Sequence, residues 1–203
     1  RIFNVENVTG SAFADTLTGD SGANVIHGGN GDDVIDGGDG DDTLYGEGGI
    51  DTLTYANAGA GVTMLLALGT AQNTGGYGID TVSGFENLVG TGFDDVLGGT
   101  LGDNILNGSL GNDTVSYAQA GSGVTVNLGT ATAQNTVGDG TDTLAGFENL
   151  TGSAFGDTLT GDANANIIDG GNGADTIEGL GGNDTLTGEI GRASCRERVS
   201  SPV

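Results

Sequence analysis

The sequence predicts an all-β fold, a right-handed parallel β-roll or β-helix solenoid with short strands. Three observations predict it: a glycine–aspartate motif of nine residues recurs along the chain, one position of the motif is always aliphatic, and related segments differ in length by whole pairs of motifs. Gly28–Asp36 (GGNGDDVID) and Gly37–Tyr45 (GGDGDDTLY) show the motif in full. Its glycines are typical of turns, and the three residues after the aspartate at position six are typical of a short strand.

Following the nine-residue phase gives three repeat blocks and two connectors. The blocks lie at residues 1–54, 90–116 and 152–188, and the related connectors at 55–89 and 117–151. Position eight of the block units is aliphatic, which predicts an inward side chain in a three-residue strand at positions seven to nine. These residues are Leu17, Ile26, Ile35, Leu44, Leu53, Leu97, Leu106, Val115, Leu159, Ile168, Ile177 and Leu186.

The connectors are expected to continue the strand stack. Val62, Met64 and Leu66 alternate as a strand should, and Phe85–Leu88 predicts a strand leading into the second block. Equivalent residues recur 62 positions later in the second connector. The connectors also contain further units, which fit the motif fully at Gly75–Ser83 and nearly at Val137–Ala145.

The spacing of related segments indicates how many units make one turn. Phe85 and Phe147 are 62 residues apart, whereas Val5 and Phe85 are 80 residues apart. The difference of 18 residues equals two units, as expected for a solenoid with two units per turn. Residues 18 positions apart should therefore stack in neighbouring layers, about 4.8 Å from each other.

Residues 189–203 do not fit the pattern. The repeat phase stops after Gly188, and this segment contains the only cysteine, the only proline and every basic residue except Arg1. Its string EIGRASCRERV resembles a translated sequencing adapter, so we treat 189–203 as a non-native tail. The rest of the chain has no cysteine, which is typical of an exported bacterial protein that folds without disulfides. We therefore expect a secreted, extracellular or cell-surface location.

The composition favours cation binding. The 203 residues include 43 glycines and 28 acidic residues but only four lysines or arginines, so the formal net charge is −24. Such acidity disfavours nucleic acid and anionic membranes as partners. No run of 18 apolar residues occurs, so we expect no membrane insertion of this segment. With a single histidine we expect no nucleophile–histidine–acid set, and no phosphate loop or zinc spacing occurs, so we expect no enzyme.

Stacking brings the position-six aspartates into columns of like charge. Two carboxylates about 4.8 Å apart repel by roughly 3.5 kcal/mol at an effective dielectric of about 20. Such a column needs protons or bridging cations to fold. Carboxylates and turn carbonyls, without histidine or thiolate, make a hard oxygen site that prefers calcium. We therefore expect several Ca²⁺ ions.

The chain resembles the RTX, or hemolysin-type, calcium-binding repeat proteins of type I secretion, through its nonapeptide units from Gly10 to Gly188. The resemblance implies that calcium lies between successive layers, held by position-six carboxylates and by carbonyls of positions one to four. The implied pairs are Asp33 with Asp51, Asp15 with Asp33, Asp95 with Asp113 and Asp157 with Asp175, with carbonyls of Gly28, Asn30, Gly31 and Gly49 around the first pair. The expected ligands also include Asp80 and Asp142 of the connector units.

Some units depart from the pattern of that family. Asp42 and Asp184 are expected to face Asn24 and Asn166, which makes weaker sites, and Asn104 has no partner within the blocks. The second glycine of the motif is replaced at Ser11, Asp20, Glu47 and Ser109. We expect incomplete calcium occupancy at these turns.

Two functional hypotheses follow. The preferred one is calcium binding and calcium-induced folding in a module of a secreted bacterial adhesin or toxin. The alternative is a noncatalytic repeat segment of an exported enzyme, such as a protease, lipase or polysaccharide epimerase, which aids folding or polysaccharide binding. The expected partners are calcium, the type I secretion apparatus and a polysaccharide or cell-surface ligand.

Overall fold

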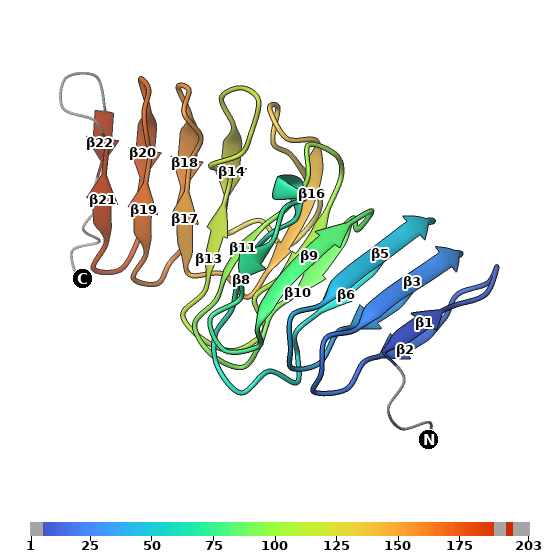
Figure 1. The fold of residues 1–203 in the computed structure, drawn as a ribbon. Coiled ribbons are helices and arrows are strands. Elements are labelled where there is room, and N and C mark those ends of the chain that lie inside the picture. The colour runs from blue at the N-terminus through green and yellow to red at the C-terminus, as the bar shows by residue number, and fades with distance from the viewer. Residues whose placement is uncertain (1–5, 189–193, 197–203) are drawn as a thin grey trace.

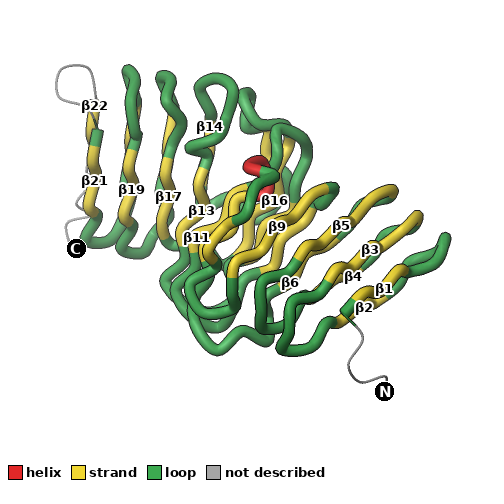
Figure 2. Tube along the Cα trace, viewed as in Figure 1, coloured by secondary structure: helices red, strands yellow, loops and turns green. Residues whose placement is uncertain are grey.

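The protein is a stack of short, mostly parallel strands, in agreement with the predicted all-β class (Figure 1). A computed structural model describes residues 6–188 and 194–196. The single helical element of this part is one 3-10 turn at Leu66–Leu68, which is red in Figure 2. Four sheets, called here the first to the fourth, contain all the strands.

The first sheet belongs to the N-terminal part of the chain. It contains, in spatial order, β1 (Asn7–Thr9), β3 (Val25–Asn30), β5 (Thr43–Gly48), β9 (Ile79–Ser83) and β8 (Gln72–Asn73). All pairs are parallel except β8 with β9. Asn7 pairs with Val25, 18 positions later, so two units make one turn as predicted.

The second sheet begins in the first block and ends in the second connector. It contains β2 (Thr16–Thr18), β4 (Val34–Asp36), β6 (Thr52–Thr54), β10 (Asn87–Val89), β12 (Ile105–Asn107), β16 (Thr141–Ala145) and β15 (Gln134–Asn135). Only β15 runs antiparallel to its neighbour. Strand β10 pairs with β6 on one side and with β12 on the other, so the sheet is continuous across the first connector.

The third and fourth sheets repeat this arrangement further along the chain. The third contains β7 (Thr63–Leu65), β11 (Val96–Gly98), β13 (Thr114–Ser116), β17 (Asn149–Thr151), β19 (Ile167–Asp169) and β21 (Thr185–Thr187). The fourth contains β14 (Thr125–Asn127), β18 (Thr158–Thr160), β20 (Thr176–Glu178) and β22 (Ser194–Arg196). All pairs within these two sheets are parallel.

Neighbouring blocks share a sheet. The first block lies between the first and second sheets, the second block between the second and third, and the third block between the third and fourth. Each connector therefore ends one sheet and starts another: β9 is the last parallel strand of the first sheet, and β7 begins the third. Figure 1 shows the strand direction changing along the stack, from the oblique β3 and β5 to the nearly vertical β20 and β21.

The core is the narrow space between paired sheets, and position eight fills it as predicted. Among these residues Leu17 and Leu186, near the two ends of the stack, are only partly buried. The others are fully or almost fully buried: Ile26, Ile35, Leu44, Leu53, Leu97, Leu106, Val115, Leu159, Ile168 and Ile177. Burial of this column of aliphatic side chains stabilises the fold through the hydrophobic effect.

The connectors also bury their apolar residues, but their strands are shorter than predicted. Val62, Met64 and Leu66 are buried, yet the strand covers only Thr63–Leu65, and the chain then turns as a 3-10 helix. Phe85 is buried too, although β10 starts only at Asn87.

Part of the segment set aside in the sequence takes part in the sheet. Strand β22 pairs with β20, and Ser194 stands opposite Thr176 with the same spacing of 18 positions. The remaining residues of 189–203 lie outside the part of the chain that the structure describes.

Candidate metal centres in the turns

The position-six residues form hydrogen-bonded ladders along the stack. Within a block, the backbone N–H of one residue donates to the side-chain Oδ1 of the residue 18 positions later. The four predicted aspartate pairs all show this contact: Asp33 to Asp51 at 2.8 Å, Asp15 to Asp33 at 2.8 Å, Asp95 to Asp113 at 2.8 Å and Asp157 to Asp175 at 3.0 Å. The structure thus brings each predicted pair into adjacent layers.

The asparagine positions follow the same rule. Asn24 donates to Asp42 at 2.8 Å and Asn166 to Asp184 at 3.0 Å, as the sequence predicts. Asn104 has no partner in a block, but its N–H donates to Asp142 of the second connector at 3.0 Å. Because the connector lengthens the chain between layers, this step spans 38 residues instead of 18.

Two glutamates take over the ladder where a connector intervenes. The N–H of Asp51 donates to Glu86 Oε2 at 2.8 Å, and that of Asp113 to Glu148 Oε2 at 2.9 Å. The sequence analysis did not assign this role to either glutamate. The signal was present, because both stand 35 residues after the aspartate that they cap and both follow a Gly-Phe pair.

The turns themselves fall into two conformations, and the first is closed by its own side chains. In a closed turn the residue at position two is Ser, Thr or Asp. The N–H of Thr91, for example, donates to Asp95 Oδ2 at 2.6 Å, while Thr91 Oγ1 accepts the N–H of Phe93 at 2.9 Å. The same two contacts occur in the turns that start at Gly10, Gly19, Gly90, Gly99, Gly152 and Gly161.

The second conformation, the open turn, has a left-handed backbone at positions two and four. Gly29 and Gly31 show it with φ of 107° and 118°. The open turns start at Gly28, Gly37, Gly46, Gly108, Gly170 and Gly179. Glu47, Ser109 and Leu180 adopt positive φ at position two, with 73°, 74° and 70°, although left-handed backbone is unfavourable for such residues.

Replacement of the second glycine does not have one uniform effect on the backbone, and incomplete calcium occupancy at these turns stays a prediction. Glu47 and Ser109 keep the open conformation of a glycine turn, whereas Ser11 and Asp20 belong to closed turns. The difference arises because Ser11 and Asp20 accept the N–H of position four, which stabilises the closed form.

Five of the open turns leave one carboxylate oxygen of position six without a hydrogen-bond partner. Among residues 6–188 and 194–196, buried Oδ2 atoms that accept no hydrogen bond belong to Asp33, Asp42, Asp51, Asp113 and Asp184. Closed turns give this oxygen the N–H of position two instead. Since residues 6–188 contain no lysine or arginine, no basic side chain of this segment neutralises the open-turn carboxylates.

Glycine at position one makes room for that oxygen. A β-carbon on Gly28 would clash with Asp33 Oδ2 and lie only 2.7 Å from the carbonyl oxygen of Gly46 in the next layer. Likewise, a β-carbon on Gly49 would clash with the carbonyl oxygen of Gly31. Carboxylate and carbonyl oxygens of adjacent layers therefore converge beside glycine backbone, which is the donor set that calcium prefers.

The predicted carbonyl donors lie at this place in the stack. Gly28 and Asn30 belong to β3, and Asn30 pairs with Gly48 of β5. The N–H of Gly31 donates to the carbonyl of Gly48 at 2.7 Å, and the carbonyl oxygen of Gly31 lies beside Gly49. Calcium ligation by these carbonyls stays a prediction.

Burial raises the pKa of several ladder carboxylates. The pKa of Asp42 rises to about 7 and that of Asp113 to about 6, and the pKa of Asp51 is raised as well. Desolvation is the main cause in each case, and neighbouring carboxylates add to it. A cation bound to these oxygens would remove the cost of keeping them ionised.

The connector carboxylates differ, because a tyrosine hydroxyl binds each of them. Tyr55 donates to Asp80 Oδ2 at 2.8 Å, and Tyr117 donates to Asp142 Oδ2 at 3.0 Å. Both tyrosines are buried, and burial together with the adjacent carboxylate raises their pKa. Asp80 and Asp142 occupy the predicted position of the motif, but their second oxygen is already hydrogen-bonded.

No compact cluster of three or more His, Cys, Asp or Glu side chains suited to a metal occurs in the described residues. A metal in these turns would therefore take most of its ligands from backbone carbonyls, with one or two carboxylates. That ratio suits calcium, which accepts many neutral oxygens, and does not suit zinc.

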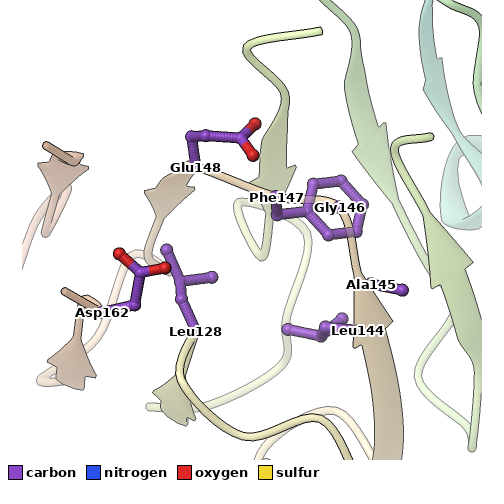
Figure 3. Close-up of a pocket in the computed structure, with 7 residues that line it drawn as sticks. All are labelled: Leu128, Leu144, Ala145, Gly146, Phe147, Glu148 and Asp162. Atoms are coloured by element: carbon purple, nitrogen blue, oxygen red, sulfur yellow. The ribbon is translucent and has the colours of Figure 1, made fainter. Parts of the chain in front are cut away.

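A small open pocket lies where the second connector meets the third block (Figure 3). Its lining consists of Leu128, Leu144, Ala145, Gly146, Phe147, Glu148 and Asp162. Glu148 and Asp162 are the ionisable groups of this lining, and Glu148 already accepts the N–H of Asp113. The lining contains no nucleophile and base that could act together.

A comparison with family models gives one match. The model described as RTX calcium-binding nonapeptide repeat (4 copies) matches residues 5–33, 18–53, 80–115, 142–177 and 151–186, which together cover more than half of the chain. A search of curated proteins finds no match. In the described part of the structure, no helix has the length and apolar character needed to cross a membrane.

Proposed function

Because the chain belongs to the RTX calcium-binding nonapeptide repeat family, whose repeats bind calcium without catalysis, we propose that it is a calcium-dependent folding module of a secreted bacterial protein of adhesin or toxin type. In this proposal the module passes through type I secretion without bound calcium. It then folds when it meets calcium outside the cell.

The observation that carries the proposal is the set of unpartnered, buried carboxylate oxygens in the open turns. A buried carboxylate without a partner is costly, and residues 6–188 offer no lysine or arginine to pair with it. Calcium between layers would satisfy these oxygens and the turn carbonyls together. Without calcium, the folded protein would remain destabilised by these buried, unpaired carboxylates.

We assign the carboxylate ligands to the open turns. They are Asp33, Asp42, Asp51, Asp113, Asp175 and Asp184. The carboxylates of Asp15, Asp95 and Asp157 accept N–H groups of their own turns, which supports a role in shaping the turn below the ion. Asp80 and Asp142 are supported less as turn ligands, because tyrosine hydroxyls bind them.

The energetics support coupling of folding to calcium. Extracellular calcium modules bind with dissociation constants of about 10⁻⁴–10⁻³ M. At about ten times the dissociation constant, each site would stabilise the fold by roughly 1.4 kcal/mol. Five or six sites would contribute about 8 kcal/mol, which is comparable with the total stability of a typical domain.

The test is far-UV circular dichroism of the chain in EDTA, followed by a calcium titration with magnesium as the control ion. We expect a largely unfolded spectrum in EDTA and a β-sheet spectrum at millimolar calcium. Magnesium should have little effect, since it prefers a compact octahedral site. A β-sheet spectrum that persists unchanged in EDTA would contradict the proposal.

A further inference from the structure

Open and closed turns differ at the residue that stands immediately before position one, which is position nine of the preceding unit. Before the closed turns this residue is never asparagine or aspartate, and the residues found there are Thr9, Thr18, Val89, Gly98, Thr151 and Thr160. Three of the open turns follow Asp36, Asn107 and Asp169. The other open turns follow His27, Tyr45 and Glu178.

Where asparagine or aspartate stands in this place, its side-chain Oδ1 accepts the N–H of position two. In the blocks these contacts run from Gly38 to Asp36 at 3.1 Å, from Ser109 to Asn107 at 3.0 Å and from Gly171 to Asp169 at 3.1 Å. In the connector units they run from Gly75 to Asn73 and from Val137 to Asn135, both at 2.9 Å. Each contact is an Asx turn, the local hydrogen bond that these two side chains favour.

Position two has a left-handed backbone in every unit that shows this contact. The angle φ is 86° at Gly38 and at Gly75, 74° at Ser109, 69° at Val137 and 70° at Gly171. A β-branched residue such as valine strongly disfavours this conformation. Because the side chain of Val137 is exposed, its own packing does not enforce the angle. The feature that these glycine, serine and valine positions share is the contact with the preceding asparagine or aspartate.

The two turn conformations give the same N–H to different acceptors. In the closed turn at Gly10, the N–H of Ser11 donates forward to Asp15 Oδ2. In the open turn at Gly108, the N–H of Ser109 donates backward to Asn107, and Asp113 Oδ2 accepts no hydrogen bond. Because a backbone residue has a single N–H, the backward contact leaves the forward acceptor free.

The two serine turns are a matched pair. Ser11 and Ser109 are the same residue at the same position of the unit, yet one turn is closed and the other is open. Two positions earlier the chain has Thr9 in the first case and Asn107 in the second. A threonine hydroxyl forms this local contact more weakly than an amide or carboxylate oxygen does.

The open turns at Gly28 and Gly46 hold position two through neighbouring layers. There β3 and β5 extend into the turn, and Gly29 pairs with Glu47. Oε1 of Glu47 also contacts Nδ1 of His27 at 2.6 Å. Selection by asparagine or aspartate therefore concerns the turns that follow a three-residue strand.

We propose that an asparagine or aspartate immediately before a turn selects the open conformation, because its side chain draws the N–H of position two away from the aspartate of position six. Asn107 acts in this way on Asp113, and Asp36 on Asp42. These are positioning residues, which decide which units present a free carboxylate oxygen. The step from an open turn to calcium binding rests on the proposed function, whereas the selection of the conformation does not.

The experiment measures the sign of φ at position two in the folded full chain, and it counts bound calcium by native mass spectrometry. Scalar couplings between HN and Hα and the Cα chemical shifts report φ by NMR. Asn107→Thr removes the acceptor, and Asn107→Asp is the matched control that retains it. The reciprocal variant is Thr151→Asn before the closed turn at Gly152, with Thr151→Val as its control, since Val89 also precedes a closed turn.

In Asn107→Thr we expect φ at Ser109 to change from positive to negative and the protein to bind one calcium ion fewer. In Thr151→Asn we expect Ser153 to acquire the positive φ that Ser109 has in the parent protein. Both controls should keep the φ and the ion count of the parent. A residue that only filled space before the turn would not produce opposite changes in the two reciprocal variants.

A positive φ at Ser109 in a folded Asn107→Thr protein would overturn the proposal. If this variant does not fold, Thr151→Asn decides, and a negative φ at Ser153 would overturn the proposal. A changed φ at Ser109 with an unchanged ion count would confirm the selection and count instead against Asp113 as a calcium ligand. The failure of the proposed function is thus distinguishable from the failure of this inference.

Discussion

Open and closed turns share one nine-residue formula but use its aspartate differently. In the closed turn at Gly90, Asp95 accepts the N–H and the hydroxyl of Thr91. In the open turn at Gly28, Gly29 has a left-handed backbone, and Asp33 Oδ2 accepts no hydrogen bond. The comparison teaches that the backbone conformation at position two decides whether the carboxylate completes its own turn or remains available for a cation; the residue type alone does not, since Ser109 lies in an open turn and Ser11 in a closed one.

Position six shows the same division. Every open turn has aspartate at position six, whereas three of the closed turns have asparagine, at Asn24, Asn104 and Asn166. A neutral amide oxygen can accept an N–H from position two, as in the contact from Asp20 to Asn24 at 2.8 Å. Charge is thus dispensable where the turn closes on itself, and it is present at position six of every open turn.

The largest expected effect on calcium-dependent stability comes from removing the position-six charges of the open turns. The same change in the closed turns is the comparison. Asp42, Asp51 and Asp113 changed together to Asn should remove about 4 kcal/mol of calcium-dependent stabilisation, or roughly 10 °C in Tm at saturating calcium. The matched control changes the closed-turn residues Asp15, Asp95 and Asp157 to Asn. Melts followed by circular dichroism with and without calcium measure both.

The control triple variant should keep most of the Tm gain on calcium addition, because asparagine already serves in other closed turns. An equal loss of that gain in the two triple variants would show that turn conformation does not select the ligands.

A smaller effect is expected from pH. The folded pKa values of Asp42, about 7, and Asp113, about 6, lie above the ordinary aspartate value of 3.8. Their protonation therefore stabilises the calcium-free fold: the contribution is fully present below about pH 4 and is lost as the pH rises through 6 to 7. Calcium needs the ionised form, so in calcium the stability should fall on acidification.

Thermal melts between pH 4.5 and 8 check this reversal. We expect Tm in EDTA to be higher at pH 5 than at pH 8, and Tm in calcium to be higher at pH 8. If Tm changed with pH in the same direction in EDTA and in calcium, these carboxylates would not exchange a proton for a calcium ion.

The smallest effect should come from a change of one turn from open to closed. Gly29→Ser places at position two the residue type found in the closed turn at Ser11. Serine disfavours the φ of 107° at Gly29, although Ser109 adopts a φ of 74° in its own open turn. We expect one calcium ion fewer and a Tm in calcium lower by roughly 3–5 °C. Ion counting by native mass spectrometry, with Ser11→Gly as the reciprocal variant, checks it.

Much of the fold could be predicted from the sequence because a repeat constrains it locally. The 18-residue spacing places Asp33 against Asp51, and the aliphatic position eight identifies inward residues such as Ile35. Both follow from the two-residue alternation of a strand and from the identical geometry of successive turns. The aspartate pairs were predictable for the same reason.

The sharing of sheets and the two turn states were not predicted. Pairing of β10 with both β6 and β12 depends on where a 35-residue connector returns, which no local pattern specifies. The closed turn depends on a contact between the N–H of position two and a side chain four residues later, which composition alone does not reveal. Glu47 and Leu180 also adopt left-handed backbone against their intrinsic preference, because the stacked layers hold the turn.

The sharing of sheets has a consequence for the order in which the chain assembles. When the first block is complete, β6 presents an unpaired parallel edge, and β10 is the next strand to add to it. Each block can therefore act as a template for its successor, which reduces the search needed to place a strand after a long connector. Layers added to this edge would extend the stack one at a time.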